Sequence, residues 1–208
     1  MFQVGDNPSD LAPYAPPKTK AQLKQWMELF FGIKVAETSV CPTHQSPLDA
    51  SWAAYSAKDP VVIWKGSRGF AGKTTLLAAI SMIELMDGAD VNVLGGSGRQ
   101  SQRVQELERD SWARNIILPD GTELLSPVSY IIPNEPLTWA TKTRYGNKMN
   151  ALTASSKSAR GPHPQRLRMD EIDEMKLSVY EAATGQPMGG LTPKGMYYES
   201  QMLLSSTE

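Results

Sequence analysis

Apolar residues recur at helical spacing in two segments near the start of the chain. Thr19 and Gln22 have the spacing of a capping box, and an apolar helical face then runs to Gly32. That face consists of Leu23, Trp26, Met27, Phe30 and Phe31. Ser46 followed by Pro47 predicts the start of a second helix. Its apolar side carries Leu48, Trp52 and Tyr55.

The pattern then alternates between strand and helix. A short apolar run from Val61 to Trp64 is followed by a glycine-bearing loop and by a helix that ends near Gly88. That helix presents Leu76, Leu77, Ile80 and Ile83 on one face. Val91 to Leu94 predicts another strand, and Gln100 to Arg114 predicts a second, more polar helix. This order predicts a mostly parallel sheet.

Signals for β-structure dominate the segment from Ile116 to Ser155. Pro119-Asp120-Gly121 predicts a turn, and Gly146-Asn147 separates two strand-like runs, Leu137 to Thr143 and Met149 to Thr153. We expect a hairpin that extends the sheet. The C-terminal part predicts two more strands, Leu167 to Met169 and Gln201 to Leu204. Between them it predicts one helix, Leu177 to Thr184.

The expected fold class is therefore α/β, with a central mainly parallel sheet flanked by helices and a β-hairpin extension. We divide the chain into an N-terminal arm with a docking helix, residues 1–35, and a main domain, residues 36–208. Four of the 15 prolines precede Lys18, as expected of an extended arm.

Composition limits the function classes. The 208 residues are 40% hydrophobic, enough for one core, and the net charge of -1 with a pI of about 6.2 provides no overall basic field for nucleic acid. Cys41 is the single cysteine, so Cys41 and His44 resemble only half of a zinc site. No apolar run approaches the roughly 20 residues that span a bilayer, and we expect no membrane association.

A glycine-bearing segment, Gly66 to Thr75, stands between a predicted strand and a predicted helix. This context is the one that a phosphate-binding loop requires, although the strict motif has glycine where Ser67 stands. Lys73 would add charge at the phosphates, and the Thr74 hydroxyl would reach Mg²⁺. The predicted nucleotide-binding residues are Ser67, Gly69, Phe70, Ala71, Gly72, Lys73, Thr74 and Thr75. The alternative is a glycine turn beside a solvated lysine.

Two adjacent carboxylates follow the predicted strand from Leu167 to Met169. Asp170 would help hold Mg²⁺, and Glu171 would orient an attacking water. The alternative is an acidic loop cap. Arg166 and Arg168 speak against a buried central strand, which should be almost wholly apolar.

Three motifs together resemble the large terminase subunit of tailed bacteriophages. They are Ser67-Arg68-Gly69 within the loop, Asp170-Glu171 with the Ile-Asp-Glu that follows it, and the hydroxyl-rich Ser205-Ser206-Thr207 after an apolar strand. The resemblance implies a P-loop NTPase fold of the additional-strand, catalytic-glutamate type. It also implies that Ser205, Ser206 and Thr207 couple the nucleotide state to moving parts.

Further roles come from the same resemblance. Arg68 would sense the γ-phosphate, with a surface arginine as the alternative. Arg160, in Ala159-Arg160-Gly161, would be an arginine finger for a neighbouring subunit, or it would contact DNA or solvent. Gln45 would recognise adenine, or it would cap the helix that follows.

The function implied is Mg²⁺-dependent ATP hydrolysis that powers translocation of viral double-stranded DNA into a procapsid, in the host cytoplasm and transiently at the portal. The expected partners are DNA, a homo-oligomeric ring (a pentamer by the resemblance), the portal protein and the small terminase subunit. We expect no nuclease activity from this chain. Candidate phosphate contacts, which are otherwise ordinary solvated charges, are Lys142, Arg144, Lys148, Arg99 and Arg103.

Two other functions fit parts of the pattern. The first lobe of a superfamily-2 helicase has a similar acidic box and a similar Ser/Thr-rich motif. A nucleotide-sensing scaffold would bind ATP without turning it over.

Overall fold

The fold was established from a computed structural model, which describes residues 15–67, 72–117, 120–124, 126–153, 155, 157, 159 and 163–207. Its helices are α1 (Lys20–Phe31), α2 (Pro47–Ser56), α3 (Lys73–Asp87), α4 (Gly98–Trp112), α5 (Pro127–Ile131), the 3-10 helix η3 (Ile172–Glu174) and α6 (Leu177–Thr184). Its strands are β1 (Val61–Gly66), β2 (Val91–Gly95), β3 (Ile116–Ile117), β4 (Glu123–Leu124), β5 (Ala140–Lys142), β6 (Lys148–Leu152), β7 (Arg166–Asp170), β8 (Gly190–Leu191), β9 (Tyr197–Tyr198) and β10 (Gln201–Thr207).

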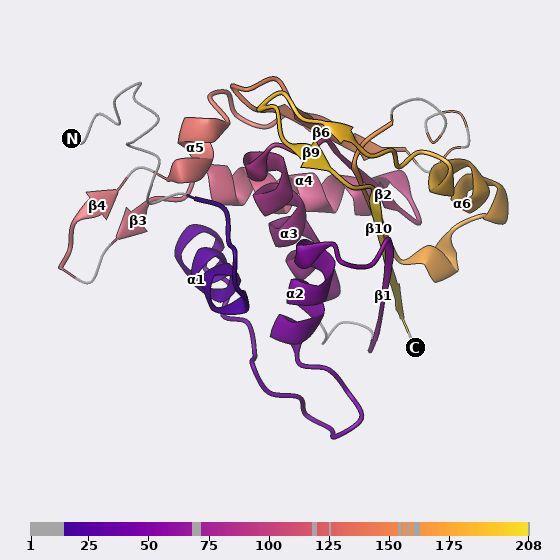
Figure 1. The fold of residues 1–208 in the computed structure, drawn as a ribbon, viewed down its shortest axis with the longest axis horizontal. Coiled ribbons are helices and arrows are strands. Elements are labelled where there is room, and N and C mark those ends of the chain that lie inside the picture. Colours follow the sequence, from indigo (N-terminus) through magenta and orange to yellow (C-terminus); the bar gives the residue numbers. More distant parts are fainter. Residues whose placement is uncertain are drawn as a thin grey trace.

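Six strands form one central sheet in the order β1-β10-β7-β2-β6-β5. Every neighbouring pair is parallel except β5 with β6, which form the antiparallel edge. Helices α2, α3 and α4 lie on one face of the sheet with α1 packed outside them, and α6 lies on the other face (Figure 1). The predicted α/β class, the mostly parallel sheet and the hairpin extension are thus confirmed.

Local capping explains where the predicted helices begin and end. The Thr19 hydroxyl accepts from the Gln22 amide at 3.2 Å, and α1 stops at Gly32, whose φ of 65° suits glycine. The Ser46 hydroxyl caps α2 by accepting from the Asp49 amide at 3.0 Å. The apolar face of α1 joins the same core as α2 and α3, so this helix is packed into the fold.

The strict alternation along β7 gives the sheet two different faces. Leu167 and Met169 point into the core on the α6 side. Arg166, Arg168 and Asp170 point to the opposite side, where Glu84 of α3 meets both arginines. A polar row therefore runs beneath α3 along a strand that is buried on both faces.

Glu84, Arg166 and Arg168 form a buried ionic group, called here the Glu84 cluster. The Glu84 carboxylate accepts from Arg166 Nε at 3.0 Å, from Arg168 Nε at 2.9 Å and also from Arg168 Nη2. Gln201 of β10 adds an acceptor for Arg168 at 2.9 Å. The expectation that β7 would be apolar if it were central is wrong, because α3 supplies a carboxylate that neutralises these arginines.

A second polar group lies between α4 and β5. The Thr141 hydroxyl is 2.7 Å from Glu108 Oε2 and 3.2 Å from Gln105 Oε1. One hydroxyl hydrogen cannot serve two acceptors, so the second hydrogen comes either from a protonated Glu108 or from the Gln105 amide turned to present its nitrogen. Burial raises the pKa of Glu108 to about 8 from its ordinary value of 4.5, which agrees with the first of these.

The smallest elements escaped the sequence patterns. Helix α5, the pair β8 and β9 and the turn of η3 were not predicted, because each spans only two to five residues and offers no periodicity. Asp120 and Gly121 do form the predicted turn, between β3 and β4. Among the described residues there is no helix with the length and hydrophobicity that crossing a membrane requires.

Replacing Glu84 by glutamine should strongly destabilise the fold. The change leaves two buried guanidinium groups without a carboxylate, which typically costs about 3–5 kcal/mol. The unfolding free energy from urea titration measures this loss. Glu135→Gln is the matched control, because Glu135 pairs with Arg109 in an exposed contact whose loss should cost about 1 kcal/mol or less. Equal losses in the two variants would contradict the structural role given to the Glu84 cluster.

The raised pKa of Glu108 predicts a pH dependence of stability. Because the folded-state pKa lies above the unfolded-state value, its contribution is complete below about pH 4.5 and is lost as pH rises through about 8. Glu108→Gln should remove a loss of about 1.4 kcal/mol per pH unit within that window. Unfolding free energies at several pH values test this, with Asp110→Asn on the exposed side of α4 as control. Parallel curves for wild type and Glu108→Gln would refute it.

Candidate functional site

The carboxyl ends of β1, β10 and β7 meet at one edge of the sheet. The chain leaves β1 at Gly66, and α3 begins at Lys73 after Gly72, whose φ is 61°. Gly72 provides no side-chain cap for α3. The amide groups in the first turn of α3 therefore lie beside the end of β1 without a side-chain acceptor from the capping residue, which suits an anionic ligand.

The carboxylate of Asp170 joins three elements at this edge. Its Oδ2 accepts from the Thr74 hydroxyl of α3 at 2.6 Å, and its Oδ1 accepts from the Ser205 hydroxyl of β10 at 2.6 Å. Asp170 is only 2% exposed, and its contact with Ser205 is buried while that with Thr74 is part-buried. The structure thus brings together Thr74 and Asp170, the two residues that the sequence nominated for a metal ion.

Lys73 lies at the same edge with its side chain folded back toward β1. Its ammonium group donates to the carbonyl oxygens of Gly66 at 2.8 Å and Ser67 at 3.3 Å. These acceptors are neutral, so an anionic ligand between β1 and α3 would compete for the ammonium group with a stronger attraction.

Glu171 leaves β7 in an unusual backbone conformation. Its φ is 52°, and among the described residues Ala57 is the other non-glycine residue with positive φ. This left-handed conformation costs of order 1 kcal/mol or more for a residue with a side chain. Glu171 Oε2 accepts from Gln100 Nε2 of α4, a contact that was not anticipated from the sequence. The capping-box spacing of Ser97 and Gln100 is a sequence signal for the start of α4 and does not indicate this contact.

The predicted coupling residues also contact acidic groups. Besides Ser205, the hydroxyls of Ser206 and Thr207 donate to Asp173 at 3.1 and 2.8 Å. The Thr207 hydroxyl is the main reason why the pKa of Asp173 lies below its ordinary value. The end of β10 is therefore hydrogen-bonded to both the end of β7 and the turn that follows it.

Several of the predicted site residues are not placed at this edge of the sheet. Arg68, Gly69, Phe70, Ala71 and Arg160 lie outside the described residues. Gln45 is exposed before α2, and the neighbouring residue, Ser46, acts as the N-cap of that helix. No contact of Gln45 with the sheet edge is described.

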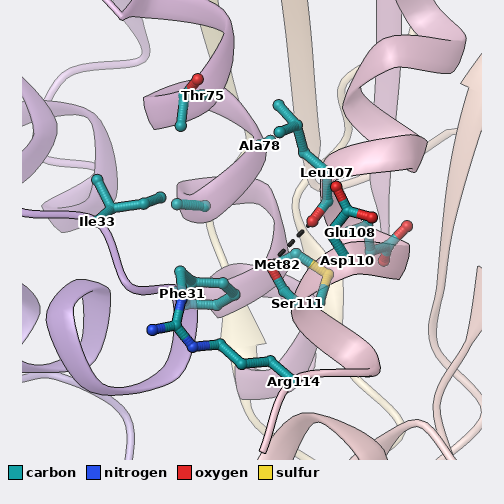
Figure 2. A pocket seen from close by; sticks show the side chains of 11 residues that line it. Phe31, Ile33, Thr75, Ala78, Met82, Leu107, Glu108, Asp110, Ser111 and Arg114 are labelled. Carbon is teal, nitrogen blue, oxygen red and sulfur yellow. Dashed lines mark hydrogen bonds between the residues drawn. The ribbon is translucent and has the colours of Figure 1, made fainter.

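Thr75 lines a separate cavity, to which neither Thr74 nor Asp170 contributes. Figure 2 shows this cavity between α1, α3 and α4, with Thr75 at one end and Arg114 at the other. Its volume is about 220 Å³, and Phe31, Ala78, Met82 and Leu107 supply much of its wall. Its lining includes none of Lys73, Thr74 and Asp170, so we assign the candidate chemistry to the polar edge and not to this cavity.

The candidate phosphate contacts are exposed on two elements. Lys142 and Lys148 face each other across the β5–β6 hairpin, and the guanidinium of Arg144 lies 3.9 Å from the centre of the Tyr130 ring. Arg99 and Arg103 are exposed on α4. Their exposure fits either of the two interpretations given above.

Metal binding at the edge would depend on few protein ligands. Among the described side chains there is no group of three or more His, Cys, Asp or Glu residues arranged to hold a metal ion. Magnesium commonly uses one or two protein oxygens and takes the others from water and phosphate. Thr74 and Asp170 match that mode of binding.

Comparison of the chain with models of known protein families gave no match, and comparison with curated proteins gave none either.

Proposed function

We propose that this chain is a Mg²⁺-dependent ATPase of the P-loop type. The observation that carries the proposal is the 2.6 Å contact between Thr74 Oγ1 and Asp170 Oδ2. It joins the first turn of the helix after a glycine-bearing loop to a buried carboxylate that ends a nearby parallel strand. A phosphate-bound magnesium ion requires that pair of oxygens at that junction.

The residues at the edge divide the work of nucleotide hydrolysis. The amides at the start of α3 and the ammonium of Lys73 would bind the phosphates. Thr74 and Asp170 would hold Mg²⁺, which when bound neutralises charge on the phosphates. Glu171 would orient the attacking water and accept its proton. Asp170 and Glu171 leave the strand in different directions, so one carboxylate can serve the metal and the other the water.

The sheet order supports the additional-strand, catalytic-glutamate type. Strand β10 lies between β1, which leads into the loop, and β7, which ends in the acidic pair. Its terminal hydroxyls contact Asp170 and Asp173. A movement of the Asp170 carboxylate would therefore change its hydrogen bond with Ser205 directly, as a coupling role requires.

The cellular role that we propose is packaging of viral double-stranded DNA. This step depends on the resemblance of the three motifs to large terminase subunits. The same resemblance implies a homo-oligomeric ring, with a portal protein and a small terminase subunit as partners. It also implies the host cytoplasm as the location. Arg68 and Arg160 would then act on the γ-phosphate, from the same subunit and from a neighbour respectively.

The first lobe of a superfamily-2 helicase is the second candidate. The contacts of Asp173 with Ser206 and Thr207 favour it, because they link the fourth residue of an acidic box to a Ser/Thr-rich strand end. Strand separation by the protein, with no packaging activity, would select this candidate over the terminase.

Two variants of the site should affect ATP turnover and ATP binding differently. Glu171→Gln should lower ATP turnover by about 10²- to 10⁴-fold while ATP still binds, because the amide cannot accept the proton of water. Lys73→Ala should weaken ATP binding itself. Steady-state phosphate release and equilibrium binding of labelled ATP measure the two effects. An unchanged turnover in Glu171→Gln would overturn the catalytic assignment, and binding without any turnover in wild type would favour the nucleotide-sensing scaffold.

A trans-acting arginine predicts a dependence on protein concentration. Turnover per subunit should rise with concentration in wild type, and Arg160→Ala should lower it by about 10³-fold or more. Arg109→Ala on α4 is the control for loss of an exposed charge, because no role at nucleotide or DNA is proposed for Arg109. Turnover that is independent of concentration, together with a silent Arg160→Ala, would remove this role from Arg160.

A further inference from the structure

Gln100 connects the start of α4 with the acidic turn after β7. Its side-chain oxygen accepts from the Ser97 amide at 2.6 Å and completes the capping box of α4. Its side-chain nitrogen donates to Glu171 Oε2 and, at 3.1 Å, to Glu174 Oε2. The opposite amide orientation would direct an oxygen at two carboxylates, so the surrounding acceptors fix which end faces Glu171.

Two glycines allow this close approach. A Cβ atom on Gly95 would lie 2.6 Å from Gln100 Cβ, and one on Gly96 would lie 3.0 Å from Gln100 Oε1 and 3.1 Å from the Glu171 carbonyl oxygen. The Gly96 amide also donates to the Asp170 carbonyl at 3.2 Å. The ends of β2 and β7 are thereby held together, with Gln100 beside both.

The backbone conformation of Glu171 explains why a hydrogen bond from Gln100 to its carboxylate would be useful. A left-handed conformation at the end of β7 directs this side chain differently from that of Asp170, and the conformation is unfavourable by itself. Catalytic groups act well only when neighbouring hydrogen bonds hold them near the productive geometry. A donor on α4 that binds the carboxylate supplies one such hydrogen bond, strengthened by the negative charge of its acceptor.

We propose that Gln100 is a positioning residue, which holds the carboxylate of Glu171 in the orientation that hydrolysis requires. This inference rests on the proposed ATPase function. Gln100 itself touches neither nucleotide nor water in this role. Its loss should therefore lower kcat and leave the KM for ATP nearly unchanged.

The structural role of Gln100 as part of the capping box can be separated from its contact with Glu171. Gln100→Glu keeps an acceptor for the Ser97 amide and removes the donor to Glu171. Gln100→Met removes both functions without adding charge. Ser97→Ala weakens the same cap by removing the hydroxyl that accepts from the Gln100 amide at 3.4 Å, and it leaves the side-chain amide of Gln100 in place.

The test measures kcat and KM for MgATP, with unfolding midpoints, in wild type, these three variants and Glu171→Gln. Gln100→Glu and Gln100→Met should each lower kcat by about 10- to 100-fold, as loss of a supporting hydrogen bond typically does. Ser97→Ala should lower the unfolding midpoint with kcat close to wild type. In a Glu171→Gln background, Gln100→Met should have no further effect on kcat, because the two residues act as one unit.

The outcomes distinguish this inference from the proposed function. If Glu171→Gln abolishes turnover while both Gln100 variants keep wild-type kcat, or lose only as much as Ser97→Ala, the positioning role is refuted and the ATPase stands. If either Gln100 variant raises kcat, the contact restrains Glu171 and the role is likewise refuted. If wild type lacks turnover, or if Glu171→Gln is silent, the proposed function fails and this role fails with it.

Discussion

The attachment of α3 to β7 is the constraint on which the site depends. Glu84 near the end of the helix binds Arg166 and Arg168 at the beginning and middle of the strand, and Thr74 at the start of the helix binds Asp170 at the strand's end. The helix and the strand are therefore joined by polar contacts at both ends. Apolar packing alone would permit small sliding movements, whereas a buried ion group and a short hydroxyl–carboxylate contact tolerate little change in distance.

Local patterns were enough to predict the longer helices and the hairpin. The caps at Thr19 and Ser46 and the glycine at position 32 bound their helices as expected, because such contacts involve residues three or four positions apart. The Glu84 cluster could not be predicted in this way. Glu84 stands in a helix that is buried on all sides, and its partners lie 82 and 84 positions along the chain. Only the three-dimensional structure reveals that a strand containing two arginines can be central.

The candidate site was partly predictable for a related reason. A glycine-bearing loop and an acidic pair are each recognisable in sequence, and the parallel sheet brings Thr74 and Asp170 together. The contact of Gln100 with Glu171 required the strand order, because β2 and β7 are neighbours in space and distant in sequence. For Gln45, the side-chain type alone was a poor guide. It suggested adenine recognition, whereas the structure shows an exposed residue before α2.

The left-handed backbone at Glu171 has a consequence for how this sequence can change. Glycine would adopt φ = 52° without the steric penalty that a side chain imposes. Selection for thermal stability alone would therefore favour glycine at this position and would discard the carboxylate. If the carboxylate has the role proposed above, stability and activity make opposite demands on this one residue, and the presence of glutamate reflects selection for activity.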